Sequence, residues 1–310
     1  MAQVQQWAQY VFLGTVLLVA VAIAGLGFLR RSREQGGGRV PGKQVTEALG
    51  LYLFVLIGYG LLGGLLQVYI PQWEAGLILA QTLFLALPAV LAIRWLGHPV
   101  GPWLSFRLPS TRALAGSAAL GLGAWAVIGL YMEGQSWIFP FPPGYEEAFA
   151  ERVLPEGWGG WLGAVLTYAL LPAFCEELLF RGALLGLLSR AMPPWTAIVL
   201  SGSLFGLLHM DPFRVVPTAL LGFVLGWVLL RTRSLFAVVL LHFLHNGVLL
   251  TLGMLFGDVP EEDAPNALVG FALVAVTLGL GLLWGPVTRF RMAARSPATS
   301  DLDLSPGSPG

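Results

Sequence analysis

Residues 158–188 read WGGWLGAVLTYALLPAFCEELLFRGALLGLL, and this stretch decides the fold. It is almost entirely apolar, and its only charged residues are Glu176, Glu177 and Arg181. A helix needs ~20 apolar residues to cross the hydrocarbon core of a membrane, so this stretch is too long for one simple span. Pro172 lacks a backbone N–H, and it therefore predicts a break in the helix near that residue. A long tilted helix with an exposed inner end is the alternative.

Eight further apolar stretches flank this one. They are Trp7–Leu29, Ala48–Ile70, Gly76–Leu96, Ala113–Met132, Trp195–Met210, Val215–Leu230, Leu235–Leu255 and Ala267–Trp284. The chain is thus predicted to be an all-α polytopic membrane protein, a bundle of about nine transmembrane helices, with eight helices and a re-entrant segment as the alternative. The first stretch is not a secretory signal peptide, because its basic residues follow it. Glycines within the spans, such as Gly58, Gly60, Gly63 and Gly64, indicate close helix packing.

The composition excludes other classes of protein. Of the 310 residues, 56% are hydrophobic and 11% are charged, whereas an ordinary soluble domain has ~25% charged residues. The net charge is zero, which argues against a nucleic-acid partner. The single cysteine, Cys175, excludes a disulfide scaffold, and it is interpreted as a small buried hydrophobic residue.

The basic residues predict the orientation of the chain, since they favour the cytoplasmic side. Alternate threading gathers nearly all of them on one side: Arg30, Arg31, Arg33, Arg39, Lys43, Arg94, Arg107, Arg112, Arg190, Arg231, Arg233, Arg289, Arg291 and Arg295. Only Arg152 and Arg214 fall on the other side, where most acidic residues lie. We expect an N-terminus outside and a C-terminus in the cytoplasm. The Arg-rich, nearly Lys-free composition suggests a bacterial plasma membrane.

Ionisable side chains inside a membrane are costly, so each one is a candidate functional residue. Those within the spans gather in one region, with a polar amide: Glu176, Glu177, Arg181, His209, His242, His245 and Asn246. Glu177 and Arg181 have i,i+4 spacing and are expected to pair. Glu176 points ~140° away from that arginine, so it is the freer carboxylate. A rise of 1.5 Å per residue puts Glu176, His209 and Asn246 at one depth, ~20 Å from the inner surface.

Two more i,i+4 pairs complete the pattern. His242 and Asn246 share one helix face, and Phe205 and His209 share another, as an aromatic wall beside an imidazole. A carboxylate and an imidazole that converge on one water form a general base, while a histidine and an asparagine supply donors for an oxyanion. This chemistry favours hydrolysis of an amide or ester without a covalent nucleophile.

The three motifs together resemble those of the CPBP family, the CAAX-protease and bacteriocin-processing (Abi) intramembrane endopeptidases. They are Glu176-Glu177-x-x-x-Arg181, Phe205-x-x-x-His209 and His242-x-x-x-Asn246, and the resemblance covers about residues 158–255. It implies that Glu176 and His209 activate the hydrolytic water, that His242 and Asn246 stabilise the oxyanion, and that Glu177, Arg181 and Phe205 support the site. His245 is not a motif position and is interpreted as a packing histidine bonded to a neighbouring carbonyl.

The resemblance also sets expectations for cofactors and partners. No cofactor is expected; zinc held by Glu176, His209 and His242 is the alternative, although no HExxH motif is present. The expected partners are the lipid bilayer and a peptide or membrane-protein substrate, prenylated or not, with no nucleic acid. The rival functions are a proton- or ion-coupled transporter and a non-catalytic family member that acts as a membrane scaffold or immunity protein. A further rival is that the polar groups only hold helices together.

Four regions are predicted along the chain. Residues 1–157 form an N-terminal four-helix membrane region, with a linker at Gly36–Gly38 and an outside loop at 134–157. Within that loop, Tyr145–Leu154 is amphipathic and is either a lid or a solvated connector. Residues 158–255 form the catalytic membrane core, 256–285 an outside loop and the last helix, and 286–310 a disordered cytoplasmic tail.

Overall fold

The computed structural model of the protein describes residues 41–154, 157–256 and 264–285. Throughout these ranges the regular elements are all helices, so the all-α polytopic membrane fold is confirmed. The predicted span Trp7–Leu29, the linker Gly36–Gly38 and the tail 286–310 lie outside the described residues.

An N-terminal helical hairpin precedes the rest of the bundle. We use "N-terminal hairpin" for residues 41–95. Its rising arm consists of α2 (Pro41–Ile57), the π-helical turn η1 (Gly58–Gly63) and α3 (Gly64–Tyr69). Its returning arm consists of α4 (Trp73–Gln81), the π-helical turn η2 (Thr82–Ala86) and α5 (Leu87–Trp95).

The remaining helices follow in chain order. They are α6 (Val100–Trp103), α7 (Thr111–Ile138), α8 (Tyr145–Val153), α9 (Gly157–Ala164), η3 (Val165–Leu170), α10 (Leu171–Glu177), η4 (Leu178–Leu184), α11 (Leu185–Ala191), α12 (Pro194–Leu208), α13 (Val215–Thr232), α14 (Leu235–Phe256) and α15 (Ala264–Leu283). In the described part of the chain, six continuous helices are long and apolar enough to span a membrane, and two shorter apolar ones, Pro194–Leu208 and Ala267–Leu283, accompany them. These eight correspond to the eight stretches expected from residue 48 onward.

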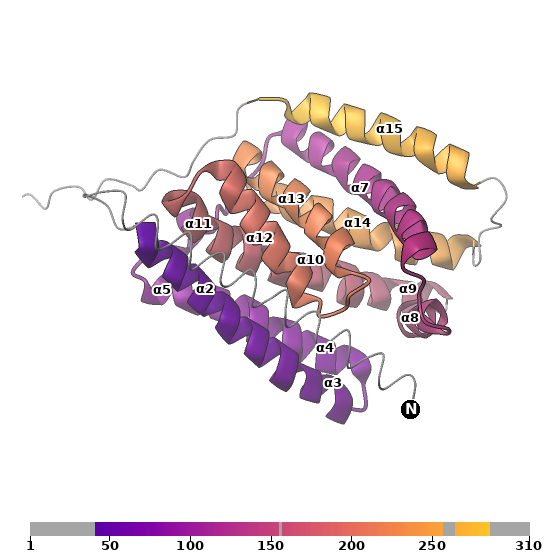
Figure 1. Cartoon of the computed structure of the whole chain (residues 1–310), viewed down its shortest axis with the longest axis horizontal. Coiled ribbons are helices and arrows are strands. Elements are labelled where there is room, and N and C mark those ends of the chain that lie inside the picture. The colour runs from indigo at the N-terminus through magenta and orange to yellow at the C-terminus, as the bar shows by residue number, and fades with distance from the viewer. Residues whose placement is uncertain (1–40, 155–156, 257–263, 286–310) are drawn as a thin grey trace, which may run out of the picture.

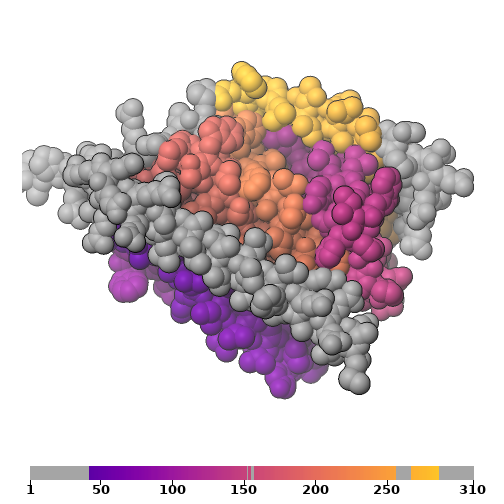
Figure 2. Space-filling model, in the orientation of Figure 1, coloured from indigo at the N-terminus to yellow at the C-terminus, as the bar shows by residue number. Residues whose placement is uncertain are grey.

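The helices are arranged in layers around the polar residues. Figure 1 shows α15 lying along α7 on one side of the molecule, and the N-terminal hairpin on the opposite side. Helices α10 to α14 lie between these two layers. The space-filling view shows the same order, with α15 and the hairpin at opposite edges (Figure 2). The segment that carries the candidate site is therefore enclosed on both sides.

Two boundary predictions were wrong. The helix does not break near Pro172: a continuous helix runs from Gly157 to Ala191. The π-helical turn η3 ends at Leu170, two residues before Pro172, and its wider winding accommodates a residue that cannot donate a backbone hydrogen bond. Helix α7 also continues to Ile138 instead of ending at Met132, so the following loop is shorter than expected.

Charged residues gather at two ends of the bundle. At one end, Arg233 lies close enough to Arg190 and Arg107 for their charges to interact. His98 lies at the same end, where burial, Arg190 and Lys43 lower its pKa. At the other end, Tyr168 donates to Glu74, and Tyr145 donates to Asp211. Figure 1 shows the start of α2 and the end of α5 opposite the start of α4 and the end of α7, which agrees with this separation.

Glycines allow the helices to approach closely, as the sequence indicated for Gly58, Gly60 and Gly63, although Gly64 has open space around it. One close approach to backbone beside the site is at Gly121 of α7. A Cβ at Gly121 would lie 2.5 Å from the carbonyl oxygen of Leu241, the residue before His242. The contact between α7 and α14 therefore sets the position of His242.

We predict that Gly121→Ala destabilises the protein. The added methyl group has to push α14 away, at a cost of about 1–3 kcal/mol in the free energy of unfolding. Thermal unfolding in detergent measures the change. Gly129→Ala is the matched control, because Gly129 lies on the same helix with nothing within 4 Å of its Cβ position. That variant should unfold at the wild-type temperature or slightly above it. Equal unfolding temperatures for the two variants would contradict the packing argument.

Candidate active site

Glu176, Glu177 and Arg181 lie on the long helix formed by α10 and η4. Glu177 and Arg181 are 0% exposed and Glu176 is 8% exposed. Burial of charge in a low-dielectric interior is unfavourable unless the groups are paired. Their partners therefore decide what each carboxylate can do.

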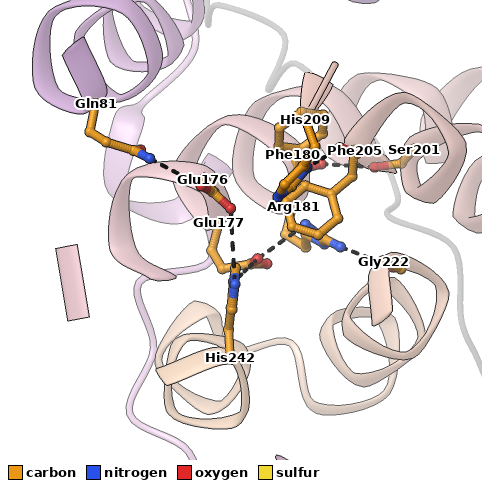
Figure 3. Close-up of polar contacts among 10 residues, drawn as sticks. All are labelled: Gln81, Glu176, Glu177, Phe180, Arg181, Ser201, Phe205, His209, Gly222 and His242. Atoms are coloured by element: carbon orange, nitrogen blue, oxygen red, sulfur yellow. Dashed lines mark hydrogen bonds and ion pairs between the residues drawn. The ribbon is translucent and has the colours of Figure 1, made fainter. Parts of the chain in front are cut away.

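Glu177 is bonded on both sides through one oxygen atom. Its Oε1 accepts a hydrogen bond from Arg181 Nη1 at 3.0 Å and lies 2.9 Å from His242 Nδ1. Arg181 also donates from Nη2 to the carbonyl oxygen of Gly222 on α13, at 3.0 Å. The predicted i,i+4 pair is present, and it joins three helices (Figure 3).

Glu176 has different partners. Gln81 donates from Nε2 to its Oε1 at 3.1 Å, and His242 Nε2 lies 3.9 Å from its Oε2. Figure 3 shows Gln81 reaching Glu176 from the side away from Arg181. Glu177 is thus bonded to an arginine and Glu176 to a neutral amide. The helical spacing had predicted that only Glu177 pairs with Arg181.

His209 follows α12 directly and is partly exposed. Its Nδ1 lies 3.0 Å from the carbonyl oxygen of Phe205. A carbonyl only accepts, so Nδ1 carries the proton and Nε2 keeps its lone pair. The Glu176 charge acts on this imidazole. His209 is therefore oriented as a base with Glu176 nearby.

Phe205 is fully buried between the two imidazoles. Its ring stands nearly perpendicular to that of His209, with centroids 5.1 Å apart, and to that of His242, with centroids 5.8 Å apart. The Arg181 guanidinium lies 4.5 Å from its centroid, within the range of a cation–π contact. The expected aromatic wall is present, and it contacts both histidines.

Two polar residues of α14 stand apart from this network. Asn246 lies one helical turn after His242 and is partly exposed, and its side chain makes no hydrogen bond to any described residue. His245 Nδ1 is buried, and it too has no hydrogen-bond partner within the described ranges. The carbonyl bond expected for His245 is therefore not made by this atom.

Gln81 was missed by the sequence analysis. It lies at the end of α4, is 2% exposed, and is also 3.5 Å from the hydroxyl group of Tyr59. The available signal was an amide within the apolar stretch Gly76–Leu96. A search for ionisable residues passes over such a side chain.

The residues considered for zinc, Glu176, His209 and His242, are not grouped as a metal site in the described part of the chain. In the described part of the chain no three His, Cys, Asp or Glu side chains are grouped so as to hold a metal ion. Nδ1 of His242 is bonded to Glu177 and Nδ1 of His209 to the Phe205 carbonyl oxygen, so Nε2 is the atom of each ring left to meet a ligand.

Residues 158–248 match the family described as type II CAAX prenyl endopeptidase Rce1-like. The resemblance to the CPBP family is confirmed. This match supports a protease-type function in general, with a peptide or protein substrate in a membrane environment. It includes all seven motif residues and ends before the last helix, while Gln81 lies outside it. No curated protein and no solved structure matches the chain.

Helix α8 is attached to the segment that follows His209. Tyr145 donates to Asp211 Oδ2 at 2.5 Å, and Arg214 lies 3.7 Å from the same carboxylate and 4.2 Å from the Phe149 ring centroid. Burial and the bond to Asp211 raise the pKa of Tyr145, so the phenol stays a neutral donor at physiological pH. The amphipathic stretch thus forms a helix, and this helix is attached to the bundle.

We predict that Arg181→Met destabilises the protein by about 3–5 kcal/mol, because it leaves the Glu177 carboxylate buried without its cation. The double variant Glu177→Gln/Arg181→Met should recover part of this loss. Thermal unfolding in detergent measures both. Lys43→Met is the control, because Lys43 has the same i,i+4 spacing to Glu47 but is 78% exposed. If Arg181→Met were as mild as Lys43→Met, the buried pair would not hold these helices together.

We also predict that Tyr145→Phe loosens α8. The variant keeps the aromatic ring but loses the donor to Asp211, at a cost of about 1–3 kcal/mol in local opening. Hydrogen exchange of the α8 amides should become faster, while exchange in α13 stays unchanged. Tyr69→Phe is a suitable control, because Tyr69 is 77% exposed. Unchanged exchange in α8 would show that the Asp211 bond does not hold the helix.

Proposed function

We propose that the chain is an intramembrane endopeptidase of the glutamic type. In this proposal Glu176 and His209 activate a water molecule, and His242 and Asn246 stabilise the oxyanion. The observation that carries it is the division of the two carboxylates: Arg181 pairs with Glu177, whereas Glu176 is bonded to the neutral Gln81. A carboxylate bound to arginine is a poor base, and Glu176 does not have that bond.

The charges of the cluster support proton transfer. Two buried carboxylates and one guanidinium leave one negative charge uncompensated. One proton on Glu176, His242 or His209 would balance this charge. The bond between His242 Nδ1 and Glu177 lets His242 carry a second proton on Nε2. In that form Nε2 donates a hydrogen bond.

The proposed reaction proceeds in two steps. Glu176 takes a proton from a water molecule while the oxygen atom of that water attacks the scissile carbonyl carbon. The negative charge that forms on the carbonyl oxygen is stabilised by His242 Nε2–H and the Asn246 amide. Glu176 then gives the proton to the leaving amine as the C–N bond breaks. His209 Nε2 accepts a hydrogen bond from the attacking water and orients it. The products are a carboxylic acid and an amine.

The other motif residues would support these groups without touching the substrate. Glu177 fixes His242 by the bond to Nδ1, and Arg181 holds Glu177. Phe205 separates the two imidazoles and keeps their rings apart. The catalytic membrane core would be residues 158–255, with a membrane-associated, prenylated or free peptide as substrate.

The proposed location is the bacterial plasma membrane, with the C-terminus in the cytoplasm. The separation of charges supports this orientation, because the basic end that contains Lys43, Arg190 and Arg233 would face the cytoplasm.

The test is peptide cleavage by purified protein in detergent. Glu176→Gln and His209→Ala should each lower kcat/KM by at least about a thousandfold, and Asn246→Ala by about a hundredfold or more, because each removes a group that acts in the transition state. Glu74→Gln is the matched control, since this carboxylate bonds to Tyr168 at the acidic end of the bundle. Activity should also survive exhaustive chelation of metal ions.

Other outcomes would favour other functions. Full cleavage by both Glu176→Gln and His209→Ala would contradict the mechanism. Loss of activity on chelation, restored by zinc, would favour a metalloprotease. Substrate-coupled proton flux into liposomes without proteolysis would indicate a transporter. A folded protein that binds a membrane partner and cleaves nothing would indicate a scaffold or immunity protein.

A further inference from the structure

The N-terminal hairpin contacts the site although it lies outside the matched segment. Gln81 is buried, and its Nε2 is 3.1 Å from Glu176 Oε1 and 3.5 Å from the Tyr59 hydroxyl. A carboxylate only accepts hydrogen bonds, so the nitrogen of the amide faces Glu176. One arm of the hairpin supplies Gln81, and the other supplies Tyr59.

The same hairpin also contacts the segment beside His209. A Cβ at Gly60 would lie 3.1 Å from the sulfur atom of Met210, the residue after His209. Met210 has a left-handed backbone with a φ of 50°, which a residue with a side chain rarely adopts without support. The hairpin therefore touches both Glu176 and the residue that follows His209.

We propose that Gln81 is a positioning residue that orients the Glu176 carboxylate for the reaction. The bond to Oε1 fixes the rotation of the carboxylate and leaves Oε2 directed toward His242 and the water. A cation at this position would neutralise the base, and an apolar side chain would let the carboxylate turn toward Arg181. An amide orients without adding charge.

The carbonyl oxygen of the Gln81 amide supports this assignment. Gln81 Oε1 is buried and has no hydrogen-bond partner among the described residues. A buried acceptor without a partner is unfavourable in a finished core and is more typical of a site that receives a donor. Gln81 thus has one acceptor left for a water molecule or a substrate N–H beside Glu176.

This inference rests on the proposed function, so its test has one readout with substrate and one without. Gln81→Met keeps the length of the side chain and removes both polar groups. We expect kcat/KM to fall about tenfold to a hundredfold, the loss typical of a hydrogen bond to a charged group. The acidic limb of the pH–activity profile should move to higher pH by about one unit, because the lost Gln81 N–H donor favoured the ionised form of Glu176. Gln81→Glu places a second acid there and should move the limb further.

Gln67→Met is the matched control. Gln67 lies on α3 of the same hairpin, and its amide bonds only to the Gly63 carbonyl in the preceding turn. It should leave the activity, the pH profile and the unfolding temperature unchanged. A purely structural role for Gln81 predicts a different result: a lower unfolding temperature with the acidic limb in its wild-type place. That result would overturn the proposal.

The second readout is the infrared C=O band of the protonated Glu176 carboxyl, assigned by its loss in Glu176→Gln and followed through a pH titration. In Gln81→Met the band should persist to higher pH than in the wild type. If the wild type cleaves no peptide but this shift is seen, the proposed function fails and the positioning role stands. If cleavage is seen and the titration of Gln81→Met coincides with that of the wild type, the positioning role fails. Gln81→Glu serves the same comparison if Gln81→Met does not fold.

Discussion

One carboxylate oxygen, Oε1 of Glu177, holds the centre of the structure together. Charges within a membrane span are stable only when they are paired, and this atom accepts from Arg181 and contacts His242 at once. Arg181 continues the connection to the Gly222 carbonyl on α13. Three helices are thereby fixed in register by one ion pair. Since both partners are fully buried, neither can be replaced alone without leaving an unpaired charge.

The pairing of Glu177 with Arg181 determines which partners are left for Glu176. The two residues are adjacent in sequence, but they point in different directions on the helix, and the single arginine is already used. Glu176 consequently meets His242 and a neutral amide. The pattern resembles many catalytic sites in which two acids are given different environments and hence different tasks. Here a structural ion pair and the carboxylate that we propose as the base share one turn of helix.

The sequence predicted what depends on local spacing. The pairs Glu177–Arg181 and Phe205–His209 follow from the helical repeat, and both contacts are present. It did not predict Gln81, because the contact with Glu176 joins residues 95 positions apart and no periodicity reports such a contact. The break expected near Pro172 was wrong for a related reason. A proline is expected to break a helix because it leaves a carbonyl of the preceding α-helical turn without a hydrogen bond. The π-helical turn before Pro172 changes the hydrogen-bonding pattern there, and the helix continues.

That wider turn has a consequence for how the chain tolerates changes of length. A π-helical turn holds one residue more than an α-helical turn without altering the direction of the residues that follow. Deletion of one residue within η3 can therefore be absorbed by rewinding to an α-helix, and Glu176 would still face His242. Without such a turn, the same deletion would rotate Glu176 by ~100° about the helix axis. Homologous chains that differ by one residue between Trp161 and Pro172 can thus keep the same site.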